Sequence, residues 1–371
     1  MKGLAALLLS IFVAMLCWGV YGPVLAVGRA GMEGSSLKPF ICVGIAYFLI
    51  AVLAPIVTLR LQGEGGHWST TGIVWSLAAG AVGALGALGI ILALAFHGSP
   101  IYVMPLVFGG APVVNTFLTM YWSKSFKQVN PIFIAGLILV IVGAVTVLVF
   151  RPQGGHGPAP TATAAAETPA AATTAADGGA PSAVASTAPR GELGARESAV
   201  QRWGMVMLFT VMTALSWGVY GPTLHRGQMA MAGSRLRPFI CVGVSYFLIA
   251  VIVPCLILLQ WQEPGHFTVM GTFWSLAGGA AGAIGALGII MAFNFGGKPI
   301  FVMPLVFGGA PVVNTFVSVT QAGQWGDLHA MFFAGLIVVI AGAVTVLIFA
   351  PKPAPHHPPA VDKPKPETAP A

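Results

Sequence analysis

The stretch VMPLVFGGAPVVNTF, residues 103–117, decides the fold, because it recurs letter for letter at residues 302–316, 199 positions later (from 103 to 302). It is apolar and long enough for most of a membrane helix, and each copy carries two prolines and one asparagine. A run of this kind written twice predicts two copies of a membrane module with a polar site where the copies meet.

Composition places the whole chain in a membrane. Apolar residues make up 57% of it and charged residues 7%, and the mean hydropathy is +0.88. Soluble domains carry about 25% charged residues, so an integral membrane protein is expected. The excess of 17 Lys and Arg over 10 Asp and Glu is scattered through loops and tails, as in membrane proteins, so it is not a nucleic-acid signal and no nucleic-acid partner is expected.

The repeat extends far beyond its central stretch. WGVYGP occupies residues 18–23 and 217–222, and LKPFICVG at 37–44 matches LRPFICVG at 236–243. Because WGVYGP recurs deep in the chain, the first apolar run is expected to be a retained helix and not a signal peptide. The chain is predicted to hold a first repeat (1–152), a disordered Ala/Thr/Pro/Gly-rich linker (153–200), a second repeat (201–351) and a disordered Pro/Lys-rich tail (352–371).

Each repeat contains five apolar runs of membrane-spanning length. In the first they cover residues 3–27, 39–61, 71–96, 100–122 and 131–150, and the second repeats the pattern. Unbroken runs exclude the alternating pattern of a membrane barrel. The predicted fold is therefore all-α, with ten transmembrane helices in two five-helix repeats.

An odd number of spans in each repeat implies that the two copies enter the membrane from opposite sides. The charges that differ between the copies agree with this inverted topology. The basic residues Arg60, Lys124 and Lys127 become Leu259, Gly323 and Gly326, whereas Ser36 and Ser99 become Arg235 and Lys298. Basic residues collect in cytoplasmic loops, so both termini are predicted inside and the linker outside, in a plasma membrane such as the bacterial inner membrane.

These features resemble the drug/metabolite transporter superfamily. Two opposed five-helix halves with Trp-Gly in each first helix, and the final helices FIAGLILVIVGAVTVLVF and FFAGLIVVIAGAVTVLIF, look like its EamA-type domain. WGVYGP followed by Gly31 and by Lys38-Pro39-Phe40 is most similar to the glucose/ribose porter and rhamnose-transporter branch. The resemblance implies a carrier that moves small metabolites by alternating access through a site between its halves.

Paired aromatic residues are candidates for that site. Trp18 and Tyr21 share one face of the first helix, and Trp217 and Tyr220 repeat it. Aromatic faces stack on the apolar side of ring compounds, although ordinary packing or an interfacial belt would use the same residues. Tyr47 and Tyr246 bring two further hydroxyls to mid-membrane depth.

The central stretch supplies polar candidates. Asn115 and Asn314, with the neighbouring Thr116 and Thr315, are predicted either to bind substrate or to hydrogen-bond a neighbouring helix. The prolines remove backbone donors and are expected to kink the helices and to serve in gating; they are Pro105, Pro112, Pro304 and Pro311.

The predicted spans carry no Asp, Glu, Lys or Arg near their centres, which argues against coupling through a membrane carboxylate. Glu64-x-x-His67 and Glu263-x-x-His266 fall in loops, where we expect solvated or gating segments and not metal sites. Sodium coordination by carbonyls near the prolines stays open. No catalytic group, metal or cofactor is expected; the expected partners are a small-molecule substrate and the bilayer, with a homodimer as a candidate assembly.

The sequence thus favours a secondary transporter of a small, neutral, polar, sugar-like metabolite. The alternative is an exporter of amino-acid-like or hydrophobic compounds. A membrane enzyme or lipid flippase is disfavoured, because the spans lack the buried carboxylates and histidines that such chemistry needs.

Overall fold

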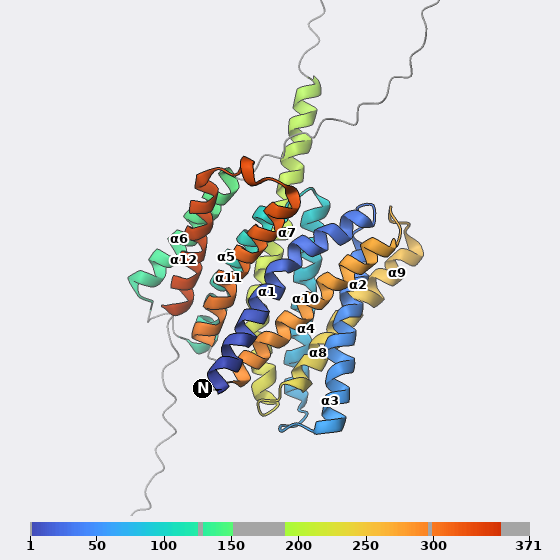
Figure 1. Cartoon of the computed structure of the whole chain (residues 1–371), viewed down its shortest axis with the longest axis vertical. Helices are drawn as coiled ribbons and strands as arrows, with labels where there is room; N and C mark the ends of the chain where they lie inside the picture. The colour runs from blue at the N-terminus through green and yellow to red at the C-terminus, as the bar shows by residue number, and fades with distance from the viewer. Residues whose placement is uncertain (1, 125–128, 151–189, 296–298, 350–371) are drawn as a thin grey trace, which may run out of the picture.

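The structure, a computed structural model, describes residues 2–124, 129–150, 190–295 and 299–349, and within these ranges every regular element is a helix (Figure 1). The first copy comprises α1 (Lys2–Gly31), α2 (Leu37–Tyr47), η1 (Phe48–Leu53), α3 (Ala54–Gln62), α4 (Thr70–Ala95), α5 (Pro100–Ser123) and α6 (Pro131–Val149). The second comprises α7 (Arg190–Ala230), α8 (Leu236–Phe247), η3 (Leu248–Ile252), α9 (Val253–Gln260), α10 (Val269–Asn294), α11 (Pro299–Ala322), η4 (Trp325–Asp327) and α12 (Ala330–Ile348).

Some predictions fall on other parts of the chain. Most of the predicted linker (153–189), the predicted tail (352–371), Lys127 and Lys298 lie outside the described residues. Residues 190–200, assigned to the linker from sequence, form the first turns of α7. The segment RGELGARESAV is rich in the helix formers Arg, Glu, Leu and Ala, which lets α7 begin before its apolar part.

Eight of the described helical segments are long and apolar enough to cross a membrane. They include two composite segments, one running through α2, η1 and α3 and the other through α8, η3 and α9. Large apolar side chains such as Leu9, Ile141 and Ile337 are more than half exposed, as expected of a surface that faces lipid. The chain is an α-helical, multi-pass membrane protein. The apolar parts of α6 and α12 are shorter, so a total of ten spans stays a prediction.

Polar residues define where several helices begin. Ser69 accepts a hydrogen bond from the backbone N–H of Gly72 at 3.0 Å and starts α4, and Thr268 does the same for α10 with Gly271 at 2.9 Å. Asn130 caps α6 in the same way. Each side chain satisfies an N–H group that has no partner inside the first helical turn.

In each copy, one proline explains the π-helical turn inside the composite helical segment. Pro55 and Pro254 follow π-helical segments at η1 and η3. A proline has no N–H for the carbonyl four residues earlier and its ring collides with that carbonyl, so the preceding turn opens into a π-helix. In contrast, α5 is helical from residue 100 to 123 and continues through Pro105 and Pro112.

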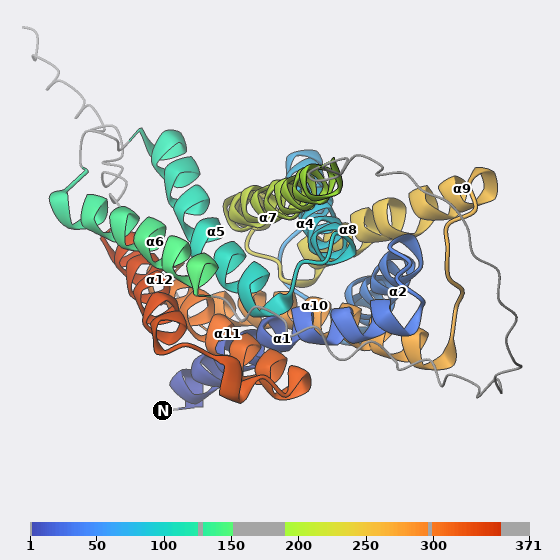
Figure 2. The same cartoon turned by 90° about the horizontal axis from the view of Figure 1, so that it is seen from above.

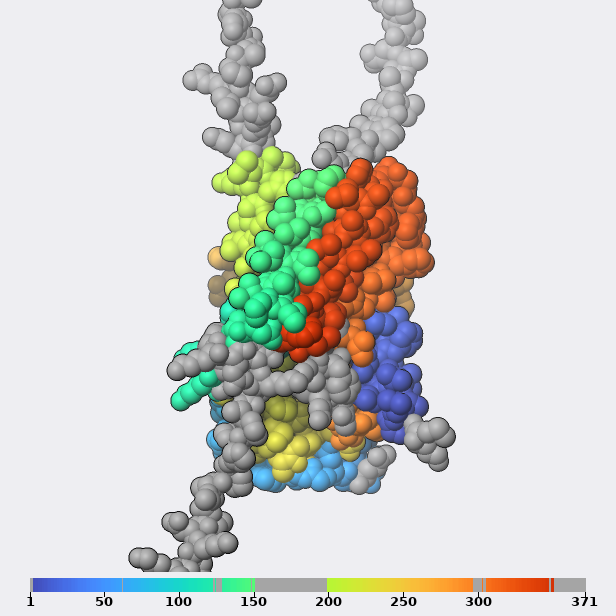
Figure 3. Space-filling view, turned by 90° about the vertical axis from the view of Figure 1, so that its left-hand side faces the viewer, coloured from blue at the N-terminus to red at the C-terminus, as the bar shows by residue number. Residues whose placement is uncertain are grey.

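The two copies interlock instead of forming separate bodies. α1 packs along α10 and α11, and α7 packs along α4 and α5, so each copy's first helix lies against the other copy (Figure 2). α6 and α12 lie side by side along one face (Figure 3). The glycines of α4 and α10 permit this close approach, because a Cβ at Gly86 or Gly285 would collide with the ring of Trp217 or Trp18.

Candidate functional site

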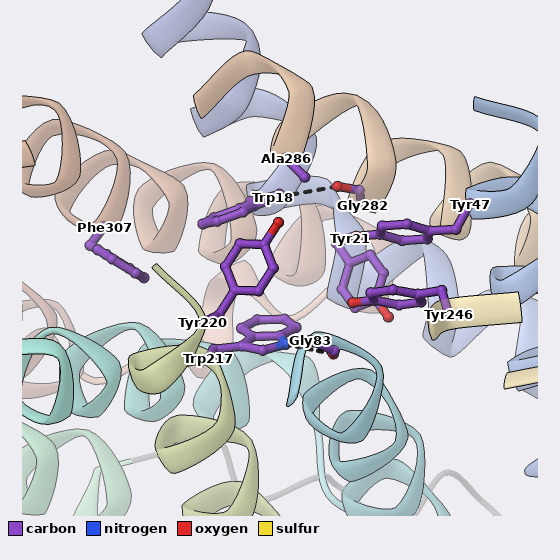
Figure 4. Close-up of a pocket in the computed structure, with 10 residues that line it drawn as sticks. All are labelled: Trp18, Tyr21, Tyr47, Gly83, Trp217, Tyr220, Tyr246, Gly282, Ala286 and Phe307. Atoms are coloured by element: carbon purple, nitrogen blue, oxygen red, sulfur yellow. Dashed lines mark hydrogen bonds between the residues drawn. The ribbon is translucent and has the colours of Figure 1, made fainter. Parts of the chain in front are cut away.

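An aromatic cavity lies where the two copies meet (Figure 4). It is built from α1, α2, α4, α7, α8, α10 and α11. Its lining residues are Trp18, Tyr21, Tyr47, Gly83, Trp217, Tyr220, Tyr246, Gly282, Ala286 and Phe307. About 30 Å³ is open to the centre of a water molecule, which is room for roughly two waters. None of these lining residues carries a charge.

The two tryptophans are held by reciprocal hydrogen bonds between the copies. The indole Nε1 of Trp18 donates to the carbonyl of Gly282 at 3.4 Å, and that of Trp217 donates to the carbonyl of Gly83 at 3.3 Å. Their ring centroids are 6.4 Å apart with an interplanar angle of 22°. Each indole is therefore oriented by the opposite copy, with its apolar ring left to form the wall.

The tyrosines supply the polar atoms of the cavity. The rings of Tyr47 and Tyr246 stack at a centroid distance of 3.6 Å and an interplanar angle of 2°. The hydroxyls of Tyr21 and Tyr220 are buried, and within the described part of the chain neither has a hydrogen-bond partner. A buried hydroxyl without a partner costs free energy, so these two groups are free to bind a polar ligand or water.

The structure gathers six of the predicted site residues and separates the others from them. Trp18, Tyr21, Tyr47 and their counterparts in the second copy all line the cavity, whereas Asn115, Asn314, Thr116 and Thr315 do not. Phe307, Gly83, Gly282 and Ala286 were not predicted. Phe307 belongs to the repeated stretch, and its apolar surroundings gave no signal.

The polar pair of the repeated stretch sits in two different environments. Asn314 is fully buried, and its amide donates to the Pro100 carbonyl at 2.9 Å. Asn115 is half-buried. The Thr116 hydroxyl donates to the Pro112 carbonyl of its own helix at 2.8 Å, whereas the Thr315 hydroxyl has no partner in the described part of the chain. Pro105, Pro112 and Pro311 are buried within α5 and α11; nothing is described of the Pro304 side chain.

Glu64 fastens the two copies together at one end of the bundle, in a set of contacts we call the Glu64 clasp. Its carboxylate accepts hydrogen bonds from the Ser234 hydroxyl at 2.6 Å and from the backbone N–H groups of Arg235 at 2.9 Å and Leu236 at 3.2 Å. The guanidinium groups of Arg235 and Arg237 lie 2.8 and 3.6 Å from it. The carboxylate thus caps α8, which belongs to the other copy.

Glu263 forms the reciprocal Glu263 clasp at the opposite end. It accepts hydrogen bonds from the Ser35 hydroxyl and from the backbone N–H groups of Ser36 at 2.7 Å and Leu37 at 3.1 Å, and so caps α2. Lys38 Nζ lies 3.8 Å from its carboxylate. Figure 1 shows the connection after α3 at the lower end and the connection after α9 at the upper end.

Burial distinguishes the two clasps. The Glu64 side chain is 5% exposed and the Glu263 side chain 20% exposed, so neither carboxylate is fully solvated, and the alternative expectation of gating loops stays a prediction. Burial raises the pKa of the Glu64 carboxyl, but the hydrogen bonds from Ser234, Arg235 and Leu236 outweigh that effect, and the net pKa lies below its ordinary value of 4.5. Glu64 is therefore charged at neutral pH.

No cluster that could hold a metal appears elsewhere in the described residues, since three or more His, Cys, Asp or Glu side chains are nowhere gathered. The four cysteines are free thiols. The aromatic cavity itself is built from aromatic rings, hydroxyls and backbone carbonyls.

Comparison with known proteins addresses the fold alone. No protein-family model matches the chain, and no curated protein sequence matches it. A crystal structure of a protein aligns over 93% of this chain and 98% of that one, with a TM-score of 0.54 and 16% sequence identity. At this identity the likeness shows that the two chains share a fold.

Proposed function

We propose that the chain is a secondary transporter that carries a small, neutral, polar metabolite of sugar-like shape through the aromatic cavity. The observation that carries the proposal is the cavity itself: both copies contribute the same residue types to it, and two buried tyrosine hydroxyls in it lack partners. Indole and phenol faces pack against the apolar faces of sugar rings, while the hydroxyls bind sugar hydroxyls.

The proposal includes ten spans in two inverted five-helix halves, with both termini in the cytoplasm of a plasma membrane. α6 and α12 each have 19 residues, about 28 Å at 1.5 Å per residue, which nearly matches a hydrocarbon core of about 30 Å. Reciprocal contacts between the copies support a two-fold axis in the membrane plane. These features also support the resemblance to EamA-type drug/metabolite transporters.

In this proposal the clasps are the gates. The Glu64 clasp closes the cytoplasmic end and the Glu263 clasp closes the outer end, and both are formed in this structure. A cavity with room for about two waters is too small for a sugar, so this conformation represents a closed state. Transport then requires one clasp to separate while the other stays formed, as alternating access demands.

A ligand panel tests this function on the purified protein. A ligand that binds only the folded state raises the unfolding temperature, and saturation at 100 times Kd contributes about 2.7 kcal/mol. We expect stabilisation by one or more neutral sugars or polyols and none by charged amino acids. Stabilisation by amino-acid-like or hydrophobic compounds alone would favour an exporter of those compounds instead.

Matched tyrosine variants locate the binding. Tyr21→Phe and Tyr220→Phe each remove one unpartnered hydroxyl without changing ring volume, and each is expected to weaken the active ligand by about 2- to 12-fold. Tyr121→Phe is the control, because Tyr121 is 69% exposed and lies outside the cavity. If all three variants weaken ligand binding equally, the ligand does not bind in the aromatic cavity.

A further inference from the structure

Three buried oxygen atoms on α11 have no hydrogen-bond partner in the described part of the chain. They are Asn314 Oδ1, Thr315 Oγ1 and Ser318 Oγ, on side chains that are between 0% and 5% exposed. Most buried polar atoms in proteins are paired, and several orphans in one place call for a bound water or ion. None of these residues lines the aromatic cavity.

Helix geometry places the three oxygens on one side of α11. Residues four apart, such as Asn314 and Ser318, and three apart, such as Thr315 and Ser318, are surface neighbours on a helix, with Cβ atoms about 5–6 Å apart. The amide nitrogen of Asn314 already donates a hydrogen bond to the Pro100 carbonyl. The amide oxygen of Asn314, which is an acceptor, is left without a partner. The Pro100 carbonyl, in the first turn of α5, accepts that bond in addition to the helical bond from the backbone N–H of Met104, so both of its lone pairs are used.

The first copy shows that this arrangement is not imposed by the local sequence. PVVNTF is identical in both copies, yet the Thr116 hydroxyl donates to the Pro112 carbonyl of its own helix at 2.8 Å. Just beyond this segment, Thr119, which corresponds to Ser318, donates to the Asn115 carbonyl at 2.8 Å. In the second copy the equivalent hydroxyls of Thr315 and Ser318 make no such bond. A serine or threonine in a membrane helix readily bonds the carbonyl four residues back, so its failure to do so leaves oxygen available for something else.

We propose that the side-chain oxygens of Asn314, Thr315 and Ser318 form a binding site for a small monovalent cation, namely sodium. All three oxygens are neutral and hard, as such an ion prefers, and a calcium or magnesium site would need carboxylates. None of these groups titrates near neutral pH, so the site takes a metal ion and not a proton. Water and backbone carbonyls complete the coordination shell.

The site stands independently of the proposed function, because ion binding does not require transport. If the chain is a carrier, the site supplies its driving ion. The group lies on α11, which packs along α1, the helix that carries Trp18 and Tyr21 of the aromatic cavity. Binding of the ion would thereby bias the packing of a helix that forms the substrate site.

Thermal unfolding of the purified full-length protein tests the proposal. Sodium chloride is compared with choline chloride and with potassium chloride at equal ionic strength. We expect the unfolding temperature to rise with sodium in a saturable way, to rise less with potassium and to be unchanged by choline. Identical curves in sodium and choline would overturn the proposal and assign the three oxygens to a bound water.

Single substitutions identify the ligands. Ser318→Ala and Thr315→Val are each expected to raise the Kd for sodium, measured by equilibrium dialysis with radioactive sodium, by about tenfold or more. Thr116→Val is the matched control, because its hydroxyl is already bonded within α5, and should leave the Kd unchanged. Equal loss of binding in the control would contradict the assignment. If a variant fails to fold, the sodium and choline comparison on the unaltered protein still decides.

Discussion

Breaking the Glu64 clasp should open one end of the molecule selectively. Glu64→Ala removes the acceptor of three hydrogen bonds from Ser234, Arg235 and Leu236 and the partner of two guanidinium groups, at a carboxylate that is 5% exposed. Losing one partner of a buried ion pair costs about 3–5 kcal/mol. Only the conformation in which this end is closed loses that energy. Its population relative to the conformation that is open at this end therefore falls by more than about a hundredfold.

Spin-label distances measure this opening. Cys17, Cys42, Cys241 and Cys255 are first replaced, and labels are then placed on exposed positions across each clasp. The label pairs are His67 with Met229 at the Glu64 end and Ala30 with His266 at the Glu263 end. We expect Glu64→Ala to lengthen the first distance and leave the second short.

Glu263→Ala should lengthen the second distance and leave the first short. The change should be smaller, because Glu263 is 20% exposed and Lys38 Nζ lies 3.8 Å from its carboxylate. Glu33→Ala is the control, since that side chain is 60% exposed and its loss should change neither of the two distances. If both distances lengthen together in either variant, or if neither changes, the clasps are not alternating gates.

Three further outcomes follow from the geometry. Gly86→Ala should lower the unfolding temperature by the equivalent of about 1–3 kcal/mol, because the added Cβ meets the Trp217 ring, whereas Gly204→Ala, which meets nothing within 4 Å, should not. Because the pKa of Glu64 is lowered on folding, its contribution is present above about pH 4.5 and is lost as the pH falls through the lowered value; Glu64→Gln should abolish that part of the pH dependence of unfolding. Asn314→Leu should destabilise the protein by about 0.5–1.5 kcal/mol, more than Asn115→Leu, because it removes the hydrogen bond from the buried Asn314 amide to the Pro100 carbonyl; the opposite order in thermal unfolding would contradict the structure.

Much of the fold could be predicted because the lengths of the apolar runs, and the polar or turn residues between them, indicate where each helix begins and ends. The predicted runs at residues 71–96 and 100–122 lie within one residue of α4 and α5 at each end. Trp18, Tyr21 and their counterparts were found from the 100° helical period, since residues three apart share a face. Periodicity places a side chain on its own helix and says nothing of which helix it meets, so Asn314 could not be separated from the cavity in advance.

The clasps show even more clearly that the sequence does not reveal which elements meet in space. Glu64 contacts residues that lie 170 or more positions away in the chain, at the start of α8. The backbone N–H groups that Glu64 caps belong to the other copy, and nothing in the sequence of its own loop identifies them. Likewise, identical PVVNTF segments predict identical threonines, yet Thr116 and Thr315 differ because their surroundings differ. Contacts between the copies decide both features.

Solute counterflow in proteoliposomes tests the central proposal most directly. Vesicles holding the purified protein are loaded with the sugar or polyol that stabilises it, and entry of the labelled compound is followed. We expect labelled solute to accumulate transiently, to do so far more slowly with the Tyr21→Phe, Tyr220→Phe double variant, and to be unaffected by Tyr121→Phe. Binding of that compound without counterflow, or counterflow that is indifferent to both cavity tyrosines, would contradict transport through the aromatic cavity.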